Sequence, residues 1–109
     1  IHWALDSPAD ENYRKIMKAE NSVPGLISVI FDKDLRHYYD LLPVCKGPSF
    51  GTEFTLAMPY IYMAHYDMLK RKDGRTGLKK LGLDPELLRI SVGAGNAEEI
   101  IKTFEASGI

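Results

Sequence analysis

The chain has 109 residues, which is long enough for one hydrophobic core and too short for two. Its composition, 45% hydrophobic and 27% charged, is that of an ordinary globular domain and excludes a disordered or fibrous chain. Fourteen Lys and Arg residues stand against fifteen Asp and Glu residues without a long block of one sign, and no apolar stretch approaches the roughly 20 residues that span a bilayer. We therefore expect a single domain with no nucleic-acid and no membrane partner.

The single cysteine, Cys45, cannot form an intramolecular disulfide, and no cluster of Cys and His at metal-ligand spacing surrounds it. This usage favours a reducing, cytoplasmic location and predicts no metal site. The sequence starts at Ile1 and has neither the basic nor the apolar segment of a secretion signal. We expect it to begin inside a longer parent protein.

The first half of the chain predicts a helix, a strand and a second helix. Ser7 and Pro8 are typical of a helix start, because Ser can cap free amides and Pro suits the first helical position. The apolar run at 26–31 predicts a central strand that is covered on both faces. Asp32 or Asp34 can cap the next helix, in which apolar residues recur at helical spacing.

The second half begins with a short strand, expected within 44–50, that enters a loop. Pro59 then opens a helix that we expect to run unbroken over 59–71. The basic segment 70–80, which contains two glycines, is expected to be an exposed connection. The Asp-Pro-Glu sequence at 84–86 predicts a short turn of helix.

The segment L-R-I-S-V-G alternates strictly between apolar and polar side chains. This period predicts a strand with Leu88, Ile90 and Val92 on one sheet face. Arg89 and Ser91 fall on the other face. The polar face is therefore the place to look for a ligand site.

Asn96 and Glu99 have the spacing of a capping box for a last helix, which Gly108 is expected to end. The predicted order is αβαβαβα, with short strands and short connections. This order favours an α+β fold with a small, mainly antiparallel sheet and helices packed on one face.

Arg89 is the residue whose setting most suggests a ligand. A guanidinium on a strand can bind a substrate carboxylate at two points, although an ordinary surface arginine is the more frequent outcome of this pattern. The small residues from Ser49 to Thr52 can let a ligand approach the backbone, and a turn without a ligand is the alternative. His65 can act as an acid or base, but such a histidine is more often packed or solvated. No phosphate-binding glycine loop, carboxylate pair or Ser/His/Asp set is present.

Four segments resemble, in order, the C-terminal domain of the cystathionine and methionine trans-sulfuration family. They are GLISVIF, SFGTEFTL, a proline-led helix with a histidine, and LGLDPELLRISVG before an acidic helix. The family carries S-L-G-G-x-E-S-L in the loop, P-x-x-x-x-H in the helix and an arginine followed by x-S-V-G in the strand. The R-I-S-V-G element is the most specific of these, and the match covers nearly the whole chain.

The resemblance implies the small domain of a fold-type I enzyme that uses pyridoxal 5'-phosphate (PLP). Members are homotetramers in which a large N-terminal domain carries the PLP lysine and the C-terminal domain closes over the substrate. The implied reaction makes or breaks C–S bonds in cystathionine, homocysteine or related γ-substituted amino acids, as a γ-synthase, γ-lyase or β-lyase. No lysine of this chain lies in the S-x-T-K context that carries PLP in the family. Residues 1–109 are thus expected to form one C-terminal small domain that lacks the PLP-binding domain, contains no catalytic residue and is inactive alone.

The same resemblance assigns three substrate-binding residues. Arg89 matches the arginine that holds the substrate's α-carboxylate, and Ser49 matches the serine whose loop lies beside the cofactor lysine and substrate. Thr55 replaces the second serine of the loop motif. The chain departs from the motif at Thr52 and at Phe54, which stands where many members have glutamate. The competing interpretation is a stand-alone α+β module that binds an amino acid, or regulates, without catalysis.

Overall fold

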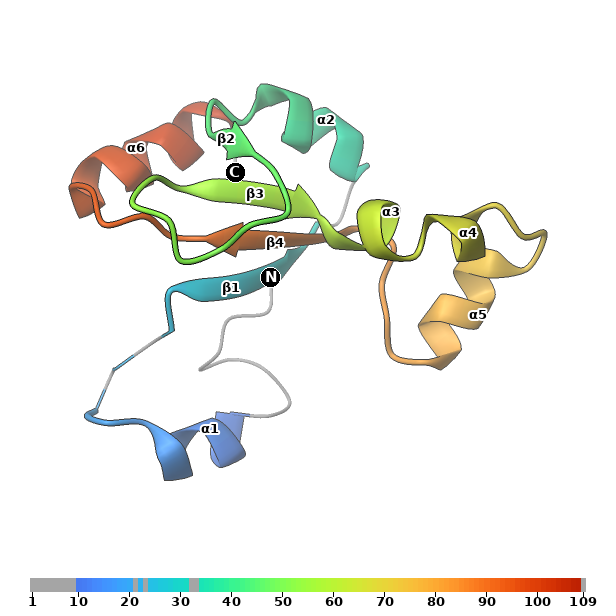
Figure 1. The fold of residues 1–109 in the computed structure, drawn as a ribbon, viewed down its shortest axis with the longest axis horizontal. Helices are drawn as coiled ribbons and strands as arrows, with labels where there is room; N and C mark the ends of the chain where they lie inside the picture. Colours follow the sequence, from blue (N-terminus) through green and yellow to red (C-terminus); the bar gives the residue numbers. More distant parts are fainter. Residues whose placement is uncertain (1–9, 21, 23, 32–33, 109) are drawn as a thin grey trace.

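A computed structural model describes residues 10–20, 22, 24–31 and 34–108, which form a four-stranded sheet with helices around it (Figure 1). None of the helices in these ranges is long and apolar enough to cross a membrane. The elements are α1 Asp10–Ile16, β1 Leu26–Ile30, α2 Leu35–Leu41, β2 Cys45–Lys46, β3 Leu56–Pro59, α3 Tyr60–Ala64, α4 Tyr66–Leu69, α5 Gly74–Lys80, β4 Leu87–Ser91 and α6 Ala97–Ala106.

The sheet has the strand order β1-β4-β3-β2. The last strand in the chain, β4, lies in the interior and pairs antiparallel with β1 on one side and β3 on the other. The two-residue strand β2 adds a parallel pair at the far edge. The predicted α+β class with a mainly antiparallel sheet is confirmed.

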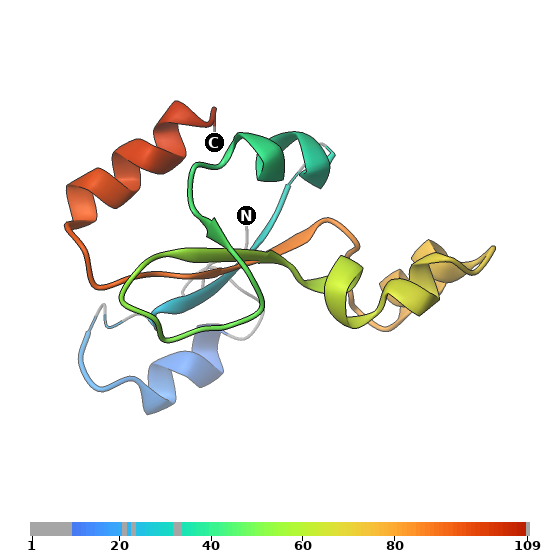
Figure 2. The same cartoon turned by 45° about the horizontal axis from the view of Figure 1, so that its top comes forward.

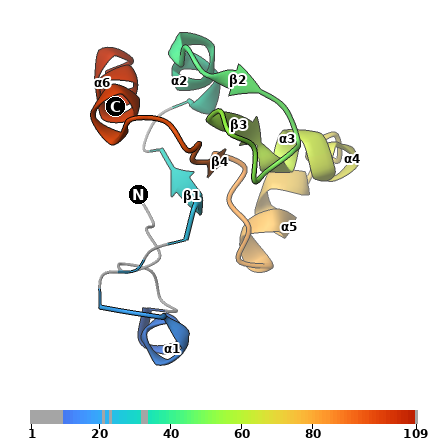
Figure 3. The ribbon, with the colours of Figure 1, turned by 60° about the vertical axis from the view of Figure 1, so that its left-hand side comes forward.

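The two faces of the sheet differ in cover. Side chains that pair directly across a ladder share a face, so Ile90 of β4 lies with Ile27 of β1 and Ala57 of β3. Helices α2 and α6 lie over this face, as seen along the sheet in Figure 3. The core between them consists of Val29, Phe31, Leu35, Leu42, Ala57, Leu88 and Ile90, with Phe104 of α6 packed against it. The opposite face carries Arg89 and is crossed by the loop before β3.

Three strand predictions need correction. The run at 26–31, expected to be a central strand covered on both faces, forms β1 at the edge of the described sheet, where Leu26 is 41% exposed. The strand expected within 44–50 is only Cys45–Lys46, and β3 was missed altogether. The sequence Leu-Ala-Met-Pro of β3 shows no alternation, because its first three residues are buried on both sides of the sheet. Pro59, expected to open a helix, ends β3 and also precedes α3.

The helical region after Pro59 also differs from the prediction. The single helix expected over 59–71 is two short helices, α3 and α4, which break at His65 with φ −133°. The segment expected to be an exposed connection contains α5, whose Leu78 is fully buried. The first residue of α5 must be glycine, because a Cβ at position 74 would lie 1.8 Å from the carbonyl oxygen of Met68. Helices α3 to α5 project from one end of the sheet (Figure 2).

Several local predictions are confirmed. Asp34 caps α2 by accepting a hydrogen bond from Arg36 N at 2.9 Å, and Asn96 caps α6 by accepting from Glu98 N at 2.9 Å. Gly108 follows α6 with φ 76°. The expected helical turn at 84–86 is instead a hydrogen-bonded turn that leads directly into β4. The helix-start signal at Ser7 and Pro8 lies outside the described residues.

Candidate functional site

The candidate site is built around Arg89, in the middle of the interior strand β4. Its register neighbours are Ser28 on β1 and Met58 on β3, so its side chain stands on the face opposite the helices. The terminal nitrogen Nη2 donates to the carbonyl oxygen of Pro48 and lies 3.5 Å from that of Ser49. The same nitrogen lies 3.3 Å from the Met58 sulfur. One corner of the guanidinium is therefore held by neutral acceptors.

Two aromatic rings flank the guanidinium carbon. The ring centroid of Phe50 lies 5.6 Å from Arg89 Cζ, and that of Tyr60 lies 5.9 Å from it. Both distances fall within the range of a cation–π contact. Phe50 is 65% exposed, so one side of this arrangement faces solvent.

Hydrogen bonds made by two other residues of the R-I-S-V-G segment, Ser91 and Gly93, also join the loop between β2 and β3 to β4. The hydroxyl of Ser91, which is buried, accepts a hydrogen bond from Gly51 N at 3.0 Å. Gly93 N donates to the hydroxyl of Thr55 at 3.0 Å. Arg89 and Ser91 reach the loop with side chains from the same sheet face, and Gly93 adds a backbone contact, so this single segment contacts the loop at three points.

Where the R-I-S-V-G segment crosses the loop before β3, there is no space for a side chain at position 93. A Cβ built there would lie 2.5 Å from the carbonyl oxygen of Glu53 and 2.7 Å from Thr55 N. The next residue, Ala94, donates from its backbone N to the same Glu53 oxygen at 2.8 Å. The backbone just after β4 therefore packs directly against the loop.

The structure brings the three sequence-predicted residues, Arg89, Ser49 and Thr55, to the place where the loop before β3 crosses β4. Their exposure to solvent and their contacts differ. Ser49 is exposed, and its backbone oxygen is the one that faces Arg89. Thr55 is half-buried, and its hydroxyl is engaged by Gly93. Thr52 donates within the loop to the carbonyl oxygen of Phe54 at 2.7 Å.

Sequence reasoning missed four residues of this site. The sequence places Tyr60 only within the helix expected over 59–71, and Phe50 only within the loop motif. Ser91 was placed on the correct face, but its hydrogen bond to the loop depends on a pairing that no local pattern encodes. Met58 belongs to the strand that was not predicted.

Arg89 has no acidic partner among the described residues, in contrast to Arg75 on α5. Arg75 donates to Glu86 at 2.9 Å and to the hydroxyl of Tyr62 at 2.8 Å. The hydrogen bond to Glu86 raises the pKa of Arg75 above its usual value. Across the described ranges, no three His, Cys, Asp or Glu side chains gather to hold a metal ion.

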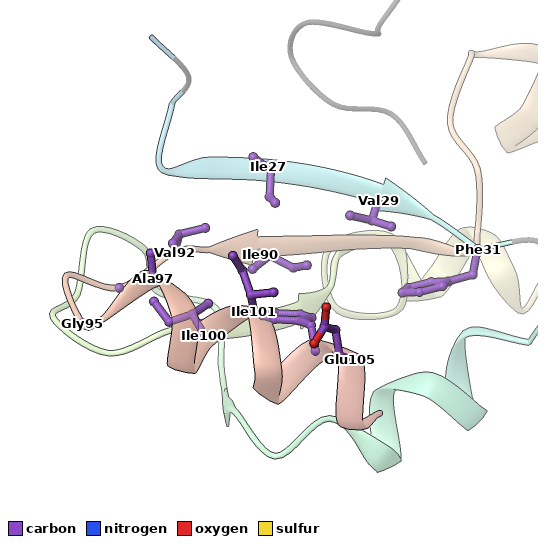
Figure 4. A pocket seen from close by; sticks show the side chains of 12 residues that line it. Ile27, Val29, Phe31, Ile90, Val92, Gly95, Ala97, Ile100, Ile101 and Glu105 are labelled. Carbon is purple, nitrogen blue, oxygen red and sulfur yellow. The ribbon is translucent and has the colours of Figure 1, made fainter. Parts of the chain in front are cut away.

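An apolar groove of about 470 Å³ lies on the other face of the sheet, between β1, β4 and α6 (Figure 4). Ile27 and Ile90 line it from the sheet, and Ile100 and Ile101 line it from the helix. Among the described residues that line it, Glu105 is the one that carries a charge. It lies on the opposite face of the sheet from Arg89, so it is separate from the candidate site.

The fold and the arginine-bearing strand define a small α+β domain of the kind found in fold-type I PLP enzymes. The structure matches that of cystathionine gamma-lyase from Lactobacillus plantarum, solved with L-serine, with a TM-score of 0.71 and 22% identity. That match covers 94% of this chain and 26% of the other.

Sequence relatives give the family. An L-2-amino-4-chloropent-4-enoate dechlorinase/desaturase from Streptantibioticus cattleyicolor is 42% identical over 95% of this chain. A cystathionine gamma-synthase from Neurospora crassa is 38% identical over 95% of it. The chain spans only 21% and 16% of the length of these relatives, and no family model matches it. The chain belongs to the cystathionine and methionine trans-sulfuration family of PLP-dependent enzymes and corresponds to its C-terminal domain.

Proposed function

We propose that this chain is the C-terminal, substrate-binding domain of a PLP-dependent enzyme that makes or breaks C–S bonds of sulfur amino acids. The observation that carries the proposal is Arg89, whose guanidinium stands on a sheet face with neutral contacts only, in the described part of the chain. A cation without an acidic partner is suited to an anionic ligand, and an α-amino acid supplies a carboxylate.

The geometry of Arg89 fits two-point binding of that carboxylate. The carbonyl oxygens of Pro48 and Ser49 engage Nη2 alone. The remaining N–H groups of the planar fork have no hydrogen-bond partner among the described residues, so an edge of the fork is available to both carboxylate oxygens. Lysine would offer only a point charge at this place.

Ser49 and Thr55 support this role differently. Ser49 is exposed and lies on the loop turn whose backbone contacts Arg89, so we assign its side chain to the substrate's side of the site. Thr55 acts through the loop, because its hydroxyl accepts from Gly93 N and thereby fixes where the loop crosses β4.

The cofactor belongs to the proposed large N-terminal domain of the parent protein. No lysine of this chain lies in the S-x-T-K context that carries PLP in the family. PLP, when bound there, withdraws electrons from the substrate's α-carbon. The residues described above would orient the substrate by its carboxylate and close one side of the site against water. By the same family relation we propose a cytoplasmic homotetramer for the full-length protein.

The names of the relatives bear on the substrate. The dechlorinase/desaturase is named for a 2-amino acid with chlorine at carbon 4. The cystathionine gamma-synthase is named for a synthesis at the γ position. Carbon 4 of a 2-amino acid is its γ-carbon, so the two names share an α-amino acid that reacts at this atom. The α-carboxylate is the group such substrates have in common, and it is the group that Arg89 is placed to bind. We therefore propose a γ-substituted amino acid as the substrate class.

The test is an assay of the full-length parent protein supplied with PLP. We expect PLP absorbance and reaction with cystathionine, with release of cysteine or homocysteine distinguishing a γ-lyase from a β-lyase. Formation of cystathionine from cysteine and a γ-substituted amino acid would identify a synthase. A full-length protein that binds an amino acid but takes up no PLP would refute the proposal in favour of a non-catalytic binding module.

The isolated chain supplies a matched control. We expect no lyase activity and no stoichiometric attachment of PLP to one lysine after borohydride reduction, measured by intact mass. Labelling of a single lysine at one equivalent would contradict the assignment of the cofactor to another domain.

A further inference from the structure

Phe50 and Tyr60, from two different elements, each place a ring beside the guanidinium of Arg89. Phe50 comes from the loop before β3, and Tyr60 is the first residue of α3. Their ring centroids lie 5.6 Å and 5.9 Å from Arg89 Cζ. An arginine side chain in solution has many rotamers, and ring contacts on its planar group restrict them.

Each ring is itself anchored. Phe50 precedes Gly51, whose backbone N donates to the buried hydroxyl of Ser91, so the loop cannot carry the ring away from β4 without breaking that hydrogen bond. Tyr60 follows Pro59, which pairs with β4, and its ring makes an edge contact with His65 at 5.7 Å between centroids. The backbone beside Phe50 and the ring of Tyr60 are therefore each held by contacts other than Arg89.

We propose that Phe50 and Tyr60 are positioning residues that hold the Arg89 guanidinium in the orientation that receives the substrate carboxylate, an inference that rests on the role proposed for Arg89. The carbonyl oxygens of Pro48 and Ser49 fix one nitrogen, and the rings fix the direction of the rest of the fork. A group that is ordered before binding loses less entropy when the ligand arrives, so the effect falls on substrate affinity. Phe50 gives this chain a ring where the family's loop motif has leucine.

The experiment is a double-mutant cycle in the full-length enzyme. Phe50→Leu and Tyr60→Leu are each made with Arg89 intact and in an Arg89→Ala background, and kcat and KM are measured. With Arg89 intact, we expect each leucine variant to raise KM about twofold to fivefold with kcat unchanged, since the contact acts on ground state and transition state alike. In the Arg89→Ala background the same changes should have no further effect.

Ring-retaining variants provide the rescue. Phe50→Tyr and Tyr60→Phe keep an aromatic face beside the guanidinium and should stay within about twofold of the wild-type KM. PLP absorbance and melting curves confirm that each variant is folded. Phe50→Leu is the safest single probe, because leucine is the residue that the family's loop carries.

The outcomes separate this inference from the proposed function. A large loss in Arg89→Ala with wild-type KM in both leucine variants overturns the positioning role and leaves the carboxylate role intact. Leucine variants that raise KM equally in the Arg89→Ala background show that the rings act elsewhere, which also overturns it. Near-normal kinetics of Arg89→Ala would reject the proposed carboxylate site and the positioning role together.

Discussion

Two arginines of this domain occupy opposite electrostatic settings. Arg75 on α5 donates to the Glu86 carboxylate at 2.9 Å and to the Tyr62 hydroxyl at 2.8 Å. Arg89 on β4 contacts carbonyl oxygens, a sulfur and two rings, and meets no acidic side chain in the described residues. The charge of Arg75 is thus satisfied by a carboxylate of the same domain, whereas that of Arg89 is left for the ligand proposed above.

The partner of Arg75 shows why its site is structural. Besides accepting from Arg75, the Glu86 carboxylate accepts from Leu35 N at 2.7 Å with its other oxygen. Leu35 is the first residue of α2, where free amides point out of the helix. One carboxylate therefore joins α5, the entry to β4 and the start of α2, and each of its two oxygens already accepts a hydrogen bond from within the domain.

The largest expected effect is on Arg89. Arg89→Ala should lower kcat/KM roughly tenfold to a few hundredfold, because a hydrogen bond to a charged group contributes about 1.5–3 kcal/mol. Arg89→Lys should restore little, since it cannot bind at two points. Steady-state kinetics of the full-length enzyme measure both variants.

The control for this prediction is Arg71, an exposed arginine whose nearest acidic oxygen, on Asp67, lies 4.0 Å away. Arg71→Ala removes the same charge away from the site and should leave kcat/KM unchanged. Equal losses in Arg71→Ala and Arg89→Ala would mean that net charge, and not the site, sets the rate. Melting curves of Arg89→Ala should stay close to wild type.

Gly93→Ala is the next largest change and tests how the loop reaches Arg89. The added Cβ would lie 2.5 Å from the carbonyl oxygen of Glu53, so either the loop or β4 must shift, at about 1–3 kcal/mol of the free energy of unfolding. Both the melting temperature and kcat/KM should fall. Gly95→Ala is the matched control, because a Cβ there meets no atom within 4 Å. Indistinguishable melting of the two variants would refute the crossing described for Gly93.

Glu86→Gln probes the structural arginine. A carboxylate accepts from both Leu35 N and Arg75, whereas an amide has one oxygen and must turn its NH₂ group toward the other donor. We expect a loss of about 1–2 kcal/mol in the free energy of unfolding with KM unchanged, measured by denaturant melts and kinetics. Glu11→Gln, in an exposed pair 3.5 Å from Lys15, should change stability little. A raised KM in Glu86→Gln would remove the contrast between the two arginines.

The smallest expected effect is on a cap remote from both arginines. Asn96→Ala removes the side-chain acceptor for Glu98 N and Glu99 N at the start of α6. Loss of such a cap costs about 1 kcal/mol, so the melting temperature should drop modestly with normal kinetics. Asn96→Asp keeps the acceptor and should melt like wild type.

Local patterns in the sequence determined the parts that depend on neighbours along the chain. The alternation around Arg89 fixed it on a strand with Leu88 and Ile90 turned into the core, because a strand has a side-chain period of two whatever it pairs with. The caps at Asp34 and Asn96 followed from the reach of a short side chain to an amide two residues on. The α+β class followed from the order of such elements.

Tertiary structure alone decided what depends on distant residues. β3 has no period of its own and becomes a strand by pairing with β4, and α5 owes its place to the burial of Leu78. The loop and the R-I-S-V-G segment are two motifs in the sequence, about 40 positions apart. They become one site only because the register of β4 in the sheet sets Ser91 against Gly51, and the absence of a Cβ at Gly93 lets the two backbones touch. Strand register is a long-range choice, so the sequence could name Arg89 but could not show the rings and carbonyl oxygens that hold it.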